Sequence, residues 1–156
     1  MASGWPEGWE SVLSAIDRHD VYSGEDGTHG IETNPHVTVL YGLHEEVHAD
    51  LVCRMCQGVS GPLEVSVEGV SLFEKDDYDV LKLDVDSSLL RKMNRAFRGL
   101  PHTNKHGEYK PHMTVAYLKS GHGSKYVDKL DVPDTVTFSK MQFTPKGAEE
   151  PINISI

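Results

Sequence analysis

The sequence has few cysteines and no long apolar run, and both absences exclude classes of protein. Its 156 residues include only Cys53 and Cys56, which fall in an apolar helical pattern without a second ligand pair at a spacing suited to structural zinc. We expect both cysteines to be reduced and packed as small hydrophobic residues. The apolar runs fall far short of the roughly 20 residues needed to span a bilayer, so we expect no membrane partner.

The N-terminal sequence, MASGWPEGWE, also lacks the basic and apolar regions of a signal peptide. A cytoplasmic location is therefore expected. Apolar residues make up 38% of the chain and charged residues 25%, as in a soluble globular protein. Residues 1–156 have the length of one compact domain, and we expect a single domain and a monomer.

A net positive charge is absent as well. The formal charge of -9 argues against binding to long nucleic acids. One segment, residues 91–125, nevertheless carries a net charge of +7, which suits a small anionic substrate; an exposed basic helix face is the alternative explanation. The segment contains one acidic residue, Glu108, and eight basic residues: Arg91, Lys92, Arg95, Arg98, Lys105, Lys110, Lys119 and Lys125.

The chain does contain one five-residue phrase twice, as Pro35-His36-Val37-Thr38-Val39 and Pro111-His112-Met113-Thr114-Val115. In each copy the proline presets an extended backbone and polar residues then alternate with apolar ones, which predicts a strand with histidine and threonine on one face. By the same alternation, Tyr41 and Tyr117 should face the other way. The histidines lie 76 residues apart, about half the chain, so we expect an internal duplication with both motif strands at its centre.

The remaining patterns predict an α+β domain of two pseudo-symmetric lobes, with antiparallel sheets lining a central cleft and helices outside. Apolar residues at helical spacing predict helices at 9–17, 44–55, 88–97 and 125–130. Alternating residues predict strands at 36–41, 63–73, 79–85, 112–118, 135–143 and 152–156. Glycine-rich residues 22–34 predict a loop that could cover a site, and residues 99–110 predict a polar loop before the second motif.

Two histidines and two hydroxyls facing one cleft are suited to phosphodiester cleavage. One histidine can act as base and the other as acid, because the usual imidazole pKa of about 6.5 allows both protonation states near neutral pH. A threonine two residues after histidine lies about 6.5 to 7 Å along the same strand face, within reach of the same phosphate. A duplicated phrase with four identities in five positions therefore favours a catalytic role over two packed histidines.

Two H-x-T motifs on strands about half a domain apart resemble the 2H phosphoesterase superfamily, which includes the LigT-like RNA ligases and cyclic phosphodiesterases. The stretches DVYSGEDGTHGIETNPHVTVLYGLHEE and YKPHMTVAYLK resemble its bacteriophage branch, the anti-CBASS nucleases. The resemblance implies cofactor-free and metal-independent cleavage of 3′,5′-linked cyclic di- or trinucleotides such as cyclic GMP-AMP, which disables host antiviral signalling in the host cytoplasm. It assigns His36 and His112 as the acid-base pair and Thr38 and Thr114 as phosphate clamps.

Substrate contacts are expected from aromatic and basic residues in the predicted loops. Trp5, Tyr22 and Tyr109 are candidates for stacking on nucleobases, which contributes about 1 to 3 kcal/mol per base; plain surface packing is the alternative. Tyr109 and Lys110 directly precede the second motif, and Lys105 lies in the same loop. We place Tyr109 and Lys110 nearest the phosphates and expect Lys105 to be a further substrate contact.

Other activities remain open from the sequence. Hydrolysis of a 2′,3′-cyclic phosphate, or cleavage or ligation of a 2′-5′ linkage in RNA, uses the same residues. A nucleotide-sequestering protein needs the cleft but not the chemistry. A zinc hydrolase would use His44-Glu45-Glu46-Val47-His48, which matches the H-E-x-x-H pattern; we expect these residues in the solvated first turn of a helix instead, without metal.

Overall fold

The computed structural model describes residues 6–156, which form helices and antiparallel strands of the expected α+β class. The chain divides into two compact units. Unit 1 consists of residues 6–37, Val65–Asp86 and Lys110–Val136, and unit 2 consists of Thr38–Glu64, Ser87–Tyr109 and Thr137–Ile156. Trp5 lies outside the described residues.

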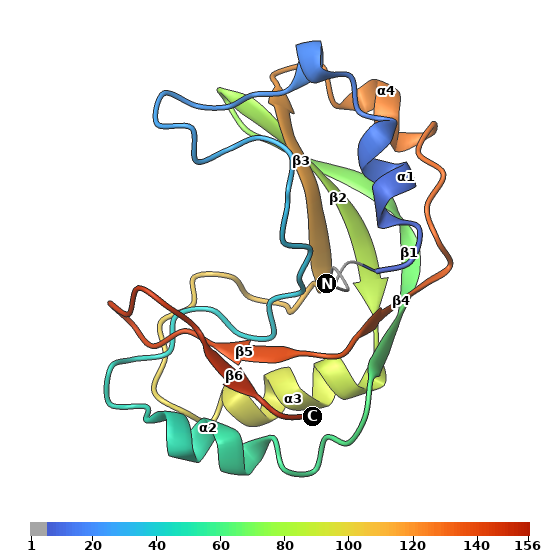
Figure 1. The fold of residues 1–156 in the computed structure, drawn as a ribbon. Helices are drawn as coiled ribbons and strands as arrows, with labels where there is room; N and C mark the ends of the chain where they lie inside the picture. The colour runs from blue at the N-terminus through green and yellow to red at the C-terminus, as the bar shows by residue number, and fades with distance from the viewer. Residues whose placement is uncertain (1–5) are drawn as a thin grey trace. The chain divides into compact units, whose positions relative to one another are not determined.

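Unit 1 is built on a long antiparallel sheet (Figure 1). Its strands are β1 (Leu63–Glu74), β2 (Tyr78–Asp86), β3 (His112–Lys119) and β4 (Thr135–Phe138), in the order β3-β2-β1-β4. The strands predicted at 63–73, 79–85 and 112–118 are therefore confirmed. The strand predicted at 135–143 is interrupted after Phe138 and resumes as β5 (Met141–Phe143).

One face of this sheet forms the core of unit 1. Leu81, Leu83 and Met113 point to it and are fully buried, as strand alternation requires. Trp9 and Val12 supply buried side chains from α1 (Trp9–Ser14), and α1 and α4 (Ser124–Val127) lie on the same side of the sheet in Figure 1. The predicted helices at 9–17 and 125–130 thus exist but are shorter, and a 3-10 turn, η1 (Arg18–Asp20), follows α1.

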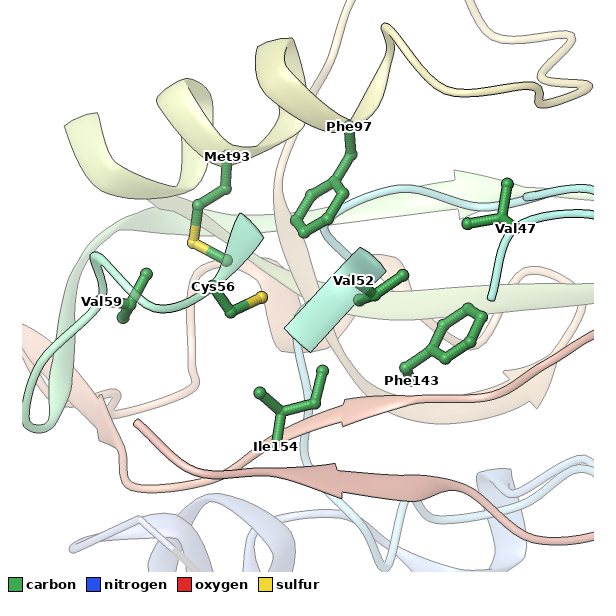
Figure 2. Close-up of a cluster of buried hydrophobic side chains, with 8 residues drawn as sticks. All are labelled: Val47, Val52, Cys56, Val59, Met93, Phe97, Phe143 and Ile154. Carbon is green, nitrogen blue, oxygen red and sulfur yellow. The ribbon is translucent and has the colours of Figure 1, made fainter. Parts of the chain in front are cut away.

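Unit 2 packs two helices against a short hairpin (Figure 2). The helices are α2 (Ala49–Met55) and α3 (Ser88–Phe97), and β5 pairs with β6 (Ile152–Ile154). α3 begins and ends where predicted. The Ser87 side chain accepts the amide hydrogen of Leu90 and caps the start of the helix. The buried cluster consists of Val47, Val52, Cys56, Val59, Met93, Phe97, Phe143 and Ile154. Both cysteines are free, as expected.

The helix predicted from residue 44 begins only at Ala49. The preceding segment bonds to another loop instead, since the amide of His44 donates to the carbonyl of Pro101 and Nε2 of His44 lies 2.7 Å from the hydroxyl of Thr103. Gly42 allows this close approach. It has a φ of +88°, and a Cβ there would lie 2.1 Å from the carbonyl oxygen of Thr103, so only glycine fits.

A buried carboxylate joins η1 to the α4 region within unit 1. Asp20, which is 5% exposed, accepts hydrogen bonds from the Tyr126 hydroxyl and from Nδ1 of His122 at 2.8 Å, and it pairs with Lys125. These contacts, with that of Lys125 the strongest, hold the pKa of Asp20 far below its usual value of 3.8. The carboxylate therefore contributes stability above its usual pKa and loses that contribution as pH falls.

We expect Asp20→Asn to lower the free energy of unfolding at pH 7, and the difference from wild type to shrink as the pH falls below about 4. Urea unfolding at several pH values measures both effects. Asp128→Asn is the matched control, because it removes the same charge from an exposed residue at the end of α4. Equal losses in the two variants, or a difference that grows in acid, would contradict the role of Asp20.

Candidate active site

The second motif lies on β3, an edge strand of the sheet in unit 1. His112 and Thr114 are half-buried, whereas Met113 and Val115 between and after them are fully buried. Thr114 pairs with Lys82 and His112 pairs with Asp84 on β2. Paired residues on antiparallel strands point to the same face. The predicted strand and its histidine-threonine face are therefore confirmed for this motif.

Tyr117 lies on the same face as His112 and Thr114, and the expectation that it faces away is wrong. The register with β2 shifts by one residue, since Leu81 pairs with Ala116 but Lys82 pairs with Thr114. Such a bulge reverses the alternation beyond it. The ring of Tyr117 accordingly contacts Tyr78 of β2 at a centroid distance of 5.7 Å, and burial beside Glu32 and Tyr78 raises the pKa of Tyr117.

A buried lysine lies on this face, and the sequence analysis did not single it out. The side chain of Lys82 is 8% exposed, and its ammonium contacts the carboxylate of Asp84 and lies 2.6 Å from the hydroxyl of Ser71. It also lies 4.4 Å from the ring centroid of Phe73, a favourable cation-π distance. Because Asp84 pairs with His112, Lys82 neutralises the carboxylate that lies beside that histidine.

Two groups of aromatic rings border the site. Phe73 meets His112 edge-on at a centroid distance of 5.2 Å. Tyr22 stacks on Tyr78 at 5.2 Å, and His29 contacts both rings and Tyr117. The structure thus brings Tyr22, an expected substrate contact, to the face that carries the second motif.

The loop expected at residues 22–34 is attached to the free edge of β3 (Figure 1). Its backbone forms three hydrogen bonds with this strand, from Tyr22 to Tyr117, from Tyr117 to Gly30 and from Glu32 to Val115. The two segments run antiparallel. The last of these bonds joins Glu32 to Val115. His36 lies four residues after Glu32, and His112 lies three residues before Val115. Both histidines therefore approach the same end of β3 within unit 1.

The first motif is not a strand, contrary to expectation. Residues 36–41 have no ladder partner among the described residues, because side chains take the carbonyl groups of this segment. The Tyr109 hydroxyl donates to the carbonyl of Thr38 at 2.9 Å, and the Asn94 amide donates to that of Val39 at 2.8 Å. The segment still alternates in exposure up to Val39, but Tyr41 is 74% exposed and does not pack on a helix.

Both motif histidines are oriented by the same hydrogen bond. Nδ1 of His36 lies 2.7 Å from the carbonyl oxygen of Asn34, and Nδ1 of His112 lies 2.9 Å from that of Lys110. A carbonyl oxygen only accepts, so Nδ1 carries hydrogen and Nε2 is left to take or give a proton. His102 makes the same bond to Leu100, which shows that a proline-histidine pair favours this geometry.

A sequence model of the 2′-5′ RNA ligase superfamily matches residues 32–139. The matched region contains both H-x-T motifs and more than half of the chain. The chain belongs to the 2′-5′ RNA ligase superfamily. This superfamily consists of 2H phosphoesterases, so the resemblance based on the two motifs is confirmed at this level. No curated protein sequence matches the chain.

Membership of the 2′-5′ RNA ligase superfamily fits a phosphodiesterase and leaves hydrolysis and ligation open. The other expected substrate contacts are distributed over both units. Lys110 is exposed and its carbonyl orients His112, whereas Tyr109 and the exposed Lys105 belong to unit 2. Thr38 also belongs to unit 2, and its role as a second phosphate clamp stays a prediction.

The H-E-x-x-H pattern does not form the arrangement that a zinc hydrolase with this motif requires. Its two histidines should lie one turn apart on a helix, but His44 precedes α2 and His48 is the residue before its first turn. Within residues 6–156, no three histidine, cysteine or acidic side chains gather as metal ligands. No helix in that part of the chain is long and apolar enough to cross a bilayer.

Proposed function

We propose that this protein is a metal-independent phosphodiesterase that cleaves 3′,5′-linked cyclic di- or trinucleotides, such as cyclic GMP-AMP, and thereby disables host antiviral signalling. The observation that carries the proposal is the matching orientation of two histidines. His36 and His112 each direct Nδ1 to a backbone carbonyl, which leaves two Nε2 atoms for proton transfer. Membership of a phosphoesterase superfamily supports the type of bond that is cleaved.

The proposed reaction needs one base, one acid and a group that binds the phosphoryl oxygens. Neutral Nε2 of one histidine takes the proton of a ribose 2′-hydroxyl, whose oxygen attacks the adjacent phosphorus. The bond from phosphorus to the 5′ oxygen breaks, and the second histidine, which starts protonated, gives its proton to that oxygen. The products are a 2′,3′-cyclic phosphate and a free 5′-hydroxyl, so protons and bonds balance.

The surroundings of His112 suit a phosphate. The Thr114 hydroxyl lies on the same strand face, at a spacing of about 6.5 to 7 Å for alternate strand residues. Lys110 is exposed directly before the motif, and Lys82 neutralises Asp84. The carboxylate of Asp84 beside His112 therefore meets a bound phosphate with its charge compensated.

We expect turnover of at least one cyclic dinucleotide or trinucleotide in excess EDTA. The protein should be incubated with cyclic GMP-AMP, cyclic di-AMP, cyclic di-GMP and cyclic triadenylate, and the products resolved by chromatography and mass spectrometry. The expected first product carries a 2′,3′-cyclic phosphate. Loss of activity in EDTA would contradict the metal-independent mechanism, and absence of turnover for every nucleotide would contradict an enzymatic role.

The superfamily match also favours a second activity, on 2′,3′-cyclic phosphates or 2′-5′ linkages. A 2′,3′-cyclic mononucleotide and a 2′-5′-linked diadenosine belong in the same panel. Cleavage of these two alone would assign the second activity instead. Tight binding of a cyclic nucleotide without turnover would identify a sequestering protein.

A further inference from the structure

Unit 1 contains a pocket beside the second motif that the proposed acid-base chemistry does not use. Residues 27–33 of the loop and Tyr117 of β3 line it. Its volume is about 320 Å³, within the roughly 300 to 1,000 Å³ of ligand pockets and suited to one base. The loop is bonded to β3 through its backbone, and both segments belong to unit 1. One unit therefore forms the whole pocket.

Glu32 points from the loop to the face of the sheet that carries the second motif. Ile31 pairs with Ala116, whose side chain is fully buried on the core face. Paired residues share a face, and successive residues of an extended segment point to opposite faces. Glu32 therefore lies on the same face as Thr114 and Tyr117. Its amide donates to the carbonyl of the residue after Thr114, so the carboxylate emerges on the segment next to the Thr114 hydroxyl.

The carboxylate of Glu32 has acceptor capacity to spare. Glu32 is half-buried, and its Oε1 accepts the amide hydrogen of Asn34 at 2.8 Å. Within residues 6–156 it forms no ion pair. A carboxylate offers about four lone-pair sites, and a negative charge close to a bound phosphate needs donors that compensate it. These features favour a ligand group with N–H donors in the pocket.

Tyr117 supplies an aromatic wall beside this carboxylate. Its ring meets His29 edge-on at a centroid distance of 4.9 Å and Tyr78 at 5.7 Å, and these contacts fix its position. Burial, with a contribution from the charge of Glu32, raises the pKa of Tyr117, so its hydroxyl is protonated at neutral pH. Aromatic side chains bind every base through its π-face. The ring therefore suits a nucleobase in general, and selectivity is left to Glu32.

We propose that this pocket binds the base of a nucleotide next to the reacting phosphate and that Glu32 selects guanine. Guanine presents adjacent N1–H and N2–H donors on its Watson–Crick edge, and a carboxylate accepts both as a pair of charge-assisted hydrogen bonds. Adenine presents an acceptor at N1, which repels the carboxylate. The inference rests on the proposed function, because it requires a nucleotide substrate, and it adds the identity of one base.

Steady-state kinetics of Glu32→Gln on cyclic di-GMP and cyclic di-AMP test this selectivity. Glutamine keeps an oxygen that accepts the amide hydrogen of Asn34, so the loop retains its bond. It loses the charge and one of the two acceptors that guanine needs. We expect the ratio of kcat/KM for cyclic di-GMP to that for cyclic di-AMP to fall roughly tenfold to a hundredfold, as for loss of a charged hydrogen bond.

Glu25→Gln is the matched control, because it removes the same charge from an exposed residue of the same loop outside the pocket. Its ratio of kcat/KM should stay at the wild-type value. Equal effects of Glu32→Gln on both substrates, or a ratio no lower than that of Glu25→Gln, would overturn the proposal.

A binding measurement separates this proposal from the proposed function. Guanosine and inosine 3′,5′-bisphosphates contain no phosphodiester to cleave, and inosine differs from guanosine only in lacking the N2 amino group. In calorimetric titrations, wild type and Glu25→Gln should bind the guanosine probe roughly tenfold or more tightly than the inosine probe, because the site rejects an analogue that lacks a donor. Glu32→Gln should lose most of this difference.

The outcomes for the pocket and for the enzyme are independent. The expected affinities without cleavage of any nucleotide would leave the pocket assigned and the enzyme rejected. Equal affinities of wild type for the two probes, or no binding of either, would overturn the guanine pocket even if cyclic nucleotides are cleaved.

Discussion

Replacement of His112 by alanine is expected to lower kcat for cyclic dinucleotide cleavage about 100-fold to 10,000-fold, the usual contribution of general acid-base catalysis. The reason is the orientation of the imidazole. Lys110 holds Nδ1, and Asp84 on β2 and Phe73 on β1 flank the ring, so Nε2 is the available proton carrier. His36→Ala should have an effect of the same size, and single-turnover assays measure both.

The double variant tests whether the two histidines act in one reaction. Residues that work as a unit give losses far from additive, so His36→Ala/His112→Ala should lose little more than either single variant. His102→Ala is the matched control, since His102 follows a proline and makes the same Nδ1 bond to a carbonyl but belongs to unit 2. An alanine at position 36 or 112 that left kcat within tenfold of wild type would refute the assignment.

The sequence predicted most of unit 1 because its strands alternate and their ends are marked. β2 and β3 begin and end within a residue of the ranges expected from apolar alternation. The bulge in β3 could not be predicted, because one extra residue leaves the local pattern of Tyr117 unchanged while it reverses the face. Only the register with β2 reveals it.

The errors in unit 2 arose from partners that lie far away in the sequence. The segment 36–41 alternates like a strand, but Asn94 and Tyr109 supply its hydrogen bonds. Glu45 and Glu46 are acidic residues typical of a helix start, but His44 bonds to Pro101 and Thr103. Local patterns cannot show which group satisfies a backbone carbonyl when that group is a side chain more than 50 residues away.

Lys82 was missed for a different reason. The run Asp79-Val80-Leu81-Lys82-Leu83-Asp84-Val85 alternates as half-exposed strands do, and a lysine on the polar face of such a strand is ordinary. Its alternation did place Lys82 and Asp84 on one face. Only the register of β2 with β3 shows that Lys82 lies opposite Thr114 and Asp84 opposite His112. This register places the lysine beside the second motif.

Lys82→Met is expected to lower kcat/KM for phosphodiester cleavage roughly tenfold or more, with the fold retained. Methionine replaces the buried stem with an apolar chain of similar length, so packing changes little. The carboxylate of Asp84, however, loses its buried partner beside His112. An uncompensated negative charge near a phosphate raises the free energy of the bound substrate and of the transition state.

The charge-balanced variant Lys82→Met/Asp84→Asn distinguishes this electrostatic role from a structural one. Removal of both charges should restore most of the lost kcat/KM, because the repulsion disappears together with the ion pair. Lys75→Met is the matched control, since Lys75 is an exposed lysine that also lies near the Phe73 ring, at 5.9 Å. If the double variant were no more active than Lys82→Met, or if Lys75→Met lost as much, the lysine would matter for packing rather than for the charge beside His112.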